Sequence, residues 1–187
     1  FFAKEEIRKS EIAIVVEGYM DLISLYQNNI KNVVAVSGTA LTEDQIQLLS
    51  RYTKNVVLLF DADTAGVKAS MRSIELLLKH NLNIKIAVLP EGEDPDSFVN
   101  KYGAEEFKKI INSSQDFLEF QTSIFEKEGR FNDAVKSTDA IRELMATVAL
   151  INDDLKRNLL IKSLSDKFNL RLKLLEDELN KILKTRS

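Results

Sequence analysis

The sequence predicts an α/β domain built on a parallel sheet, followed by a small all-α helical bundle. Two observations predict this fold class. Short apolar runs alternate with stretches of helical spacing in the first part of the chain, as is typical of right-handed βαβ units. Beyond residue 112 the apolar residues recur only at intervals of three and four, as in packed helices. We therefore expect two domains, residues 1–112 and residues 113–187.

Four apolar runs are expected to be strands: residues 12–16 (IAIVV), 32–37 (NVVAVS), 55–60 (NVVLLF) and 84–89 (IKIAVL). Parallel strands covered on both faces are apolar throughout rather than alternating, so these runs fit a buried parallel sheet. Helices are expected between them. Their apolar positions are Leu22, Leu25 and Tyr26, then Ile46, Leu48 and Leu49, then Met71, Ile74, Leu77 and Leu78.

The rest of the chain is expected to be helical. A helix is expected to begin near Pro95, and from Ser113 onward no segment has the pattern of a strand. The polar stretch 129–133 is the clearest break between the helices of this region. Its apolar stripes are more typical of a bundle's own core than of a partner groove.

The composition limits the class of protein. The 187 residues are 44% hydrophobic and 29% charged, as in an ordinary soluble globular protein. No apolar run is long enough to span a membrane, so no membrane attachment is expected. The chain has no cysteine, which excludes disulfides and thiolate zinc sites and is consistent with a reducing cytoplasm. Because it opens on Phe1-Phe2 without Met, we expect a piece of a longer protein.

The charge is nearly balanced. Up to Ser114 there are 13 basic and 16 acidic residues, and after it 13 of each. Neither half is therefore a strongly basic surface for phosphate backbones. The single histidine, His80, is expected to have no functional role.

Acidic residues or a glycine loop follow each predicted strand. In strand order they are Glu17; Gly38 and Thr39; Asp61 and Asp63; and Asp94 and Asp96. The carboxyl ends of parallel strands meet at one edge of a sheet, where ligands of open α/β folds bind. We therefore expect these residues to gather at that edge.

The paired carboxylates predict a divalent metal site. Asp61 and Asp63 are two residues apart in an extended segment, so their side chains point to the same side. Crowded carboxylates repel and raise one another's pKa unless a cation lies between them. Oxygen ligands without His or Cys favour Mg²⁺ or Mn²⁺, whose shell is completed by water and substrate phosphate.

Each motif also has a purely structural interpretation, in which its polar residues cap or begin helices. The residues concerned are Asp63 or Thr64, Asp94 before a helix begun by Pro95, Glu17 with Asp21, and Thr42. The metal site is the favoured interpretation, because capping alone does not require paired carboxylates twice and a further acid at the first strand.

Four motifs, VVEGYMD, AVSGTALT, LLFDADTAG and LPEGEDPD, resemble in order and spacing the Toprim domain of bacterial DnaG-type DNA primases. They cover about residues 12–103, and the later segment ALINDDLKRNLLIKSLSDKF is more loosely similar to the last subdomain of the primase catalytic core. The resemblance implies a Toprim-type fold. It also implies synthesis of short RNA primers from nucleoside triphosphates on single-stranded DNA, at the replication fork in the bacterial cytoplasm and with the replicative helicase as partner.

The resemblance also implies roles for individual residues. Glu17 matches the family's essential glutamate, and its metal-binding acids are matched by Asp61, Asp63, Asp94 and Asp96. The supporting loop positions are matched by Gly18, Asp21, Gly38 and Thr39. Lys68 is a candidate phosphate contact, although a solvated helix lysine is the commoner case. Glu17 either completes the metal shell or handles the proton, and both roles stay open.

Parts of the family pattern are missing from the sequence. It has no Cys/His zinc module, no basic region ahead of the Toprim motifs and no helicase-binding region after Ser187. We therefore expect a primase core cut at both ends, which binds the helicase through regions outside this chain and makes no primers unaided.

Three alternatives stay open. LLFDADTAG also resembles the signature of haloacid-dehalogenase-type phosphatases, in which Asp61 would be a nucleophile, but that family carries the motif on its first strand. Another Toprim enzyme, a topoisomerase or nuclease, is the second alternative, and a topoisomerase would need a nucleophilic tyrosine from another domain. The third is a non-catalytic scaffold with a helical docking module.

Overall fold

The structure is a computed structural model that describes residues 2–36, 41–60 and 73–186. The chain divides into two compact units, Phe1–Phe117 and Leu118–Ser187. Within the described residues no helix is long and apolar enough to cross a membrane.

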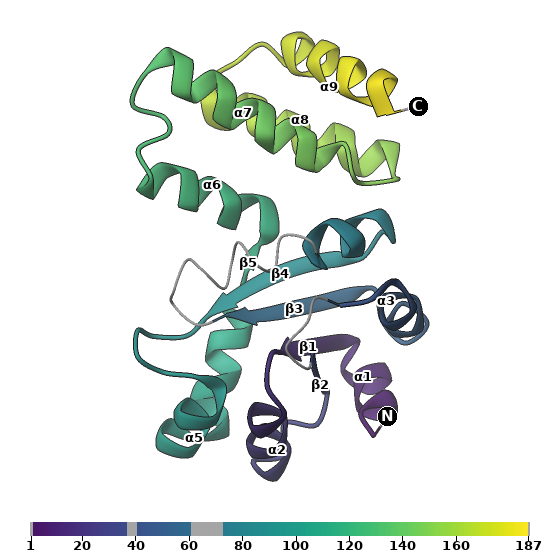
Figure 1. Cartoon of the computed structure of the whole chain (residues 1–187), viewed down its shortest axis with the longest axis vertical. Coiled ribbons are helices and arrows are strands. Elements are labelled where there is room, and N and C mark those ends of the chain that lie inside the picture. The colour runs from purple at the N-terminus through teal and green to yellow at the C-terminus, as the bar shows by residue number, and fades with distance from the viewer. Residues whose placement is uncertain (1, 37–40, 61–72, 187) are drawn as a thin grey trace. The chain divides into compact units, whose positions relative to one another are not determined.

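The first unit is built on a five-stranded sheet in the order β2-β1-β3-β4-β5 (Figure 1). The strands are β1 (Ile12–Val16), β2 (Val33–Ala35), β3 (Asn55–Phe60), β4 (Asn83–Val88) and β5 (Gln115–Asp116). All neighbouring strands are parallel except β4 and β5. The predicted parallel sheet is confirmed. β1 and β3 have the predicted bounds, β2 is shorter than its apolar run, and β4 begins and ends one residue earlier.

One helix precedes the first strand, and other helices connect successive strands. They are α1 (Lys4–Ser10), α2 (Tyr19–Gln27), α3 (Glu43–Leu49), a helical segment over residues 73–79, and α5 (Pro95–Asn112), which bends at Gly103. Gly103 has φ 85° and ψ 171°, a backbone conformation that favours glycine. Figure 1 shows α2 and α5 on the same side of the sheet, where they contact each other.

A hydrophobic core lies between the sheet and this helix pair. Its buried members are Ile14, Val16, Leu25, Ile30, Val33, Val57, Leu59, Ala87, Leu89, Phe98, Val99 and Phe107. The intervening strand residues, such as Ala13 and Val15, are also buried. Both faces of the central strands are therefore covered, which explains why their sequences are apolar throughout.

Replacing Phe107 with Ala is expected to lower the free energy of unfolding by about 3–5 kcal/mol, because a fully buried ring is removed and leaves a cavity. Urea unfolding of the chain followed by circular dichroism measures this loss. The neighbouring exposed residue offers the control, since Lys108→Ala should change stability by less than about 0.5 kcal/mol. Equal losses in the two variants would contradict the assignment of Phe107 to the core.

One strand lies where the sequence predicts only helices. β5 pairs antiparallel with β4, and Lys85 lies opposite Asp116 across the pair. The expectation that no strand occurs after Ser113 was wrong. A two-residue strand is too short for any periodic pattern, and its place depends on pairing with a strand thirty residues earlier in the chain. The opposite charges of the cross-strand pair favour this pairing.

The second unit contains only helices among its described residues. α6 (Phe117–Lys127) leads into it from the first unit, and α7 (Ala134–Val148), α8 (Asp154–Phe168) and α9 (Leu172–Arg186) contact one another. Their buried residues include Leu144 and Met145 of α7, Ile161 of α8 and Leu175 of α9. The predicted break lies between α6 and α7, which confirms the helical interpretation of this region.

Candidate active site at the carboxyl edge of the sheet

The strand order creates a topological switch point between β1 and β3. The chain leaves β1 toward β2 on one side and leaves β3 toward β4 on the other. Val15 pairs with Leu58, so continuing this register by two residues places Glu17 level with Phe60, the residue before Asp61. Ligands of open α/β sheets bind at such a point. The strands that precede the predicted acids, β1 and β3, therefore end side by side.

Glu17 and Gly18 form the turn between β1 and α2. The Glu17 side chain is exposed, and Gly18 is the N-cap of α2 in an extended conformation. A Cβ at Gly18 would lie 2.9 Å from Oδ2 of Asp21, in the first turn of the helix. Glycine thus allows the Asp21 carboxylate to fold back against the start of α2.

Two of the predicted helix caps are confirmed. Thr42 Oγ1 accepts a hydrogen bond from the backbone N–H of Gln45 at 3.3 Å and begins α3. Asp94 Oδ1 accepts one from the backbone N–H of Ser97 at 2.7 Å, and Pro95 is the first residue of α5. Capping occupies one oxygen of Asp94, whose side chain is exposed. A carboxylate has two oxygens, so capping and metal binding are compatible for this residue.

The structure joins two of the predicted site residues directly. The backbone N–H of Asp96 donates to Oδ1 of Asp21 at 3.2 Å. The Asp96 carboxylate accepts hydrogen bonds from Ser24 of α2 and from Asn100 of α5. Asp21 and Asp96 therefore hold the N-terminal ends of α2 and α5 together at the carboxyl edge of the sheet.

Glu93 is a further acid in this loop, and it was not among the predicted site residues. Its carboxylate accepts hydrogen bonds from the Ser97 hydroxyl at 2.6 Å and from the Lys101 ammonium at 3.0 Å. The Ser97 hydrogen bond, with Lys101, lowers the pKa of Glu93. These contacts direct the Glu93 carboxylate toward Ser97 and Lys101 of α5. The ammonium of Lys101 balances the charge of this carboxylate.

The other predicted site residues lie outside the described residues: Asp61, Asp63, Gly38, Thr39 and Lys68. Over residues 2–36, 41–60 and 73–186, no group of three or more His, Cys, Asp or Glu side chains could hold a metal ion. The donors that Glu17, Asp94 and Asp96 offer are carboxylate oxygens, which are ligands of hard divalent cations.

Asp94 allows capping and metal binding to be separated. Asn caps helices about as well as Asp, so Asp94→Asn should lose less than about 0.5 kcal/mol of stability, whereas Asp94→Ala should lose about 1 kcal/mol. Both variants should bind Mn²⁺ more weakly, because both remove the carboxylate. Thermal unfolding and Mn²⁺ titration of the pair check this. Parental Mn²⁺ affinity in Asp94→Asn would leave Asp94 with the capping role alone.

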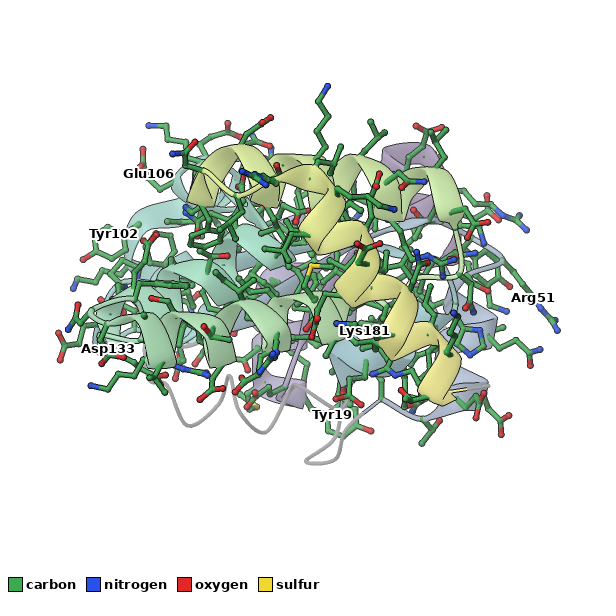
Figure 2. All side chains as sticks on the ribbon, turned by 90° about the horizontal axis from the view of Figure 1, so that it is seen from above. Tyr19, Arg51, Tyr102, Glu106, Asp133 and Lys181 are labelled. Carbon is green, nitrogen blue, oxygen red and sulfur yellow. The ribbon has the colours of Figure 1, made fainter. Side chains whose placement is uncertain are left out.

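A groove of about 610 Å³ lies along α2 and β2. Its lining includes Tyr19, Ile23 and Tyr26 of α2 and Val34 of β2, and none of the described residues that line it is acidic. Tyr19 is 62% exposed and points outward in Figure 2. The groove is therefore apolar, unlike the edge that carries Glu17 and Asp94.

Comparison with known proteins identifies similar chains. A family profile described as Toprim-like matches residues 14–99. The DNA primase of Aquifex aeolicus is 41% identical over 92% of this chain, which corresponds to 33% of that protein. The chain thus spans about a third or less of the length of the curated primases that it matches.

Solved structures agree with the sequence matches. A DNA primase domain from Pseudomonas aeruginosa is 30% identical with a TM-score of 0.81, over 95% of this chain and 57% of that one. A DnaG primase catalytic domain bound to single-stranded DNA is 29% identical with a TM-score of 0.77, over 88% and 54%. The resemblance predicted from the four motifs is confirmed. These likenesses do not favour the phosphatase, topoisomerase or scaffold alternatives.

Proposed function

Because the chain belongs to the family of bacterial DnaG-type DNA primases, we propose that it is the Toprim and helical part of a primase catalytic core. The proposed reaction is metal-dependent nucleotidyl transfer that makes short RNA primers on single-stranded DNA for replication. We assign the reaction to residues 1–112 and propose residues 113–187 as a helical subdomain. The proposed place of action is the replication fork in the bacterial cytoplasm, with the replicative helicase bound through regions outside this chain.

The observation that carries this proposal is the placing of Glu17 at the end of β1, beside the end of β3. Asp61 follows the last residue of β3 in the sequence, and the start of α5 adds Asp94. In this proposal, three elements contribute acids to one edge of the sheet. This supports a shared site for Mg²⁺ or Mn²⁺, in which Asp61, Asp63 and Asp94 are the proposed ligands and Asp96 is auxiliary.

The chain's own groups suit the binding of a nucleoside triphosphate. The N-terminal ends of α2 and α5 are joined at this edge through Asp21 and Asp96, and helix N-termini favour phosphate through their free N–H groups and dipoles. Lys68 is a proposed further phosphate contact. When bound, divalent cations lower the pKa of the attacking ribose hydroxyl and neutralise charge on the leaving pyrophosphate. Glu17 is proposed either to complete the cation shell or to accept the proton.

Primer synthesis by the full-length protein tests the proposal. With single-stranded template, the four nucleoside triphosphates and Mg²⁺, we expect short RNA products that disappear when the template is omitted. The same preparation should not hydrolyse a simple phosphomonoester. Phosphomonoester hydrolysis without RNA synthesis would replace the proposal with the phosphatase.

The 187-residue chain alone is expected to make no primers. Its acidic and basic residues nearly balance, with a formal net charge of -3, and holding a template backbone requires clustered Lys and Arg. A primer assay at low salt, where backbone binding is strongest, checks this. Robust template-directed synthesis by the chain would show that it binds the template without such a cluster.

A further inference from the structure

A line of polar side chains joins α2 to α5 beside the candidate active site. Asp21 and Ser24 of α2 and Asn28, which caps its C-terminal end, follow one another at helical spacing, so they lie on one side of that helix. Asp96 and Asn100 are four residues apart on α5 and share a face in the same way. Hydrogen bonds connect the two sets across 72 to 75 residues of sequence.

Asp96 is the centre of this line. Its carboxylate Oδ1 accepts one hydrogen bond from the Ser24 hydroxyl and a second from Asn100 Nδ2 at 2.8 Å. Its backbone N–H donates to Asp21 at 3.2 Å. Donors from two different helices therefore orient the Asp96 carboxylate. The Asp21 carboxylate holds the main chain of Asp96.

The two donors differ in their surroundings. Ser24 is only 5% exposed, and its hydroxyl is directed to Asp96 in the packed interface between α2 and α5. Asn100 is exposed and lies one turn further along α5. Since the χ2 torsion of an aspartate is otherwise broad, two donors on the same oxygen restrict how the carboxylate can rotate. Both side-chain hydrogen bonds made to Asp96 by the described residues end on Oδ1.

The restricted orientation of the Asp96 carboxylate matters because this aspartate is a proposed auxiliary ligand of the divalent cation. With Oδ1 occupied by Ser24 and Asn100, the lone pairs of Oδ2 are those that can face a cation. Ligating carboxylates are commonly oriented by such hydrogen bonds, and loss of the orienting group weakens metal affinity. Nothing in the local sequence around Ser24 or Asn100 distinguishes them from ordinary helix residues.

We propose that Ser24 and Asn100 are positioning residues, which orient the Asp96 carboxylate for a divalent cation. This inference rests on the proposed cation site and adds the residues that preorganise one of its ligands. Because Ser24 lies on α2 and Asn100 on α5, the orientation of Asp96 also depends on how these two helices pack. The protein's own side chains make these hydrogen bonds, so the orientation of the ligand is built into the packing of the two helices.

The test is a titration of the 187-residue chain with Mn²⁺ alone, in which free Mn²⁺ is followed by electron paramagnetic resonance. Removing both donors in Ser24→Ala/Asn100→Ala should weaken Mn²⁺ affinity about 10- to 100-fold. Ser24→Thr keeps the hydroxyl and should stay within about threefold of the parent. Asn100→Ala alone changes an exposed residue and serves as a second variant if Ser24→Ala does not fold.

Ser165→Ala is the matched control. Ser165 is also a buried helix serine, 7% exposed, but its hydroxyl donates to the Leu170 carbonyl in the second unit. It should lose stability comparably and keep the parental Mn²⁺ affinity. Parental affinity in the folded double variant, or in Asn100→Ala if that is the variant that folds, would overturn the positioning role and leave the cation site standing. A parent chain that binds no Mn²⁺ would overturn the cation site and the positioning role together.

Discussion

Primer synthesis by the full-length protein is expected to collapse in the Glu17→Gln variant, while its free energy of unfolding stays within about 1 kcal/mol of the parent. The substitution keeps the shape of the side chain and removes one charge from the end of β1. Glu17 is exposed, so the change creates neither a cavity nor a buried unpaired group. The stability that it does lose reflects a helix-start charge near α2, worth about 0.3–1 kcal/mol.

Primer yield measured together with urea unfolding separates the competing functions. If Asp61 were a phosphatase nucleophile, the Gln variant would keep its activity, and a phosphate-mimicking fluoride would bind at Asp61. A scaffold would prime normally in both forms. Glu105→Gln supplies the control, because Glu105 is an exposed acid that pairs with Lys108 on the second half of α5. Near-normal primer yield from the Glu17 variant would refute the catalytic role.

Loss of Mn²⁺ binding is the second large effect expected, in the double variant Asp61→Asn/Asp63→Asn. Amides are poorer ligands for a hard cation than carboxylates, and two proposed direct ligands change at once. The affinity should therefore fall by at least about 100-fold, beyond the usual cost of losing an orienting neighbour. Isothermal calorimetry of the 187-residue chain should show binding heat in the parent and none in the variant.

The metal-free variant should be as stable as the parent or slightly more stable, because repulsion among crowded carboxylates is relieved. A thermal melt without metal measures this. Added Mn²⁺ should then raise the melting temperature of the parent and leave that of the variant unchanged. Equal binding heat in both proteins would mean that the cation binds elsewhere.

Local sequence was sufficient for the features that depend on neighbouring residues. The runs 12–16 and 55–60 are β1 and β3 as predicted, because strands buried on both faces are apolar at every position. The caps at Thr42 and Asp94 were recognisable too, since a cap is made within three residues of chain. The order of the motifs along the chain was enough to indicate the primase family, and similar proteins confirm it.

The tertiary structure decided the features that depend on distant residues. The strand order, which brings the ends of β1 and β3 together, follows from how the helices pack on the sheet and has no local signal. β5 exists only because β4 offers an edge to pair with. Likewise, the contact of Ser24 with Asp96 could be recognised only from the packing of α2 against α5, because this hydrogen bond spans 72 residues of sequence. Local patterns report burial and capping, whereas contacts between distant helices depend on the packing of the whole unit.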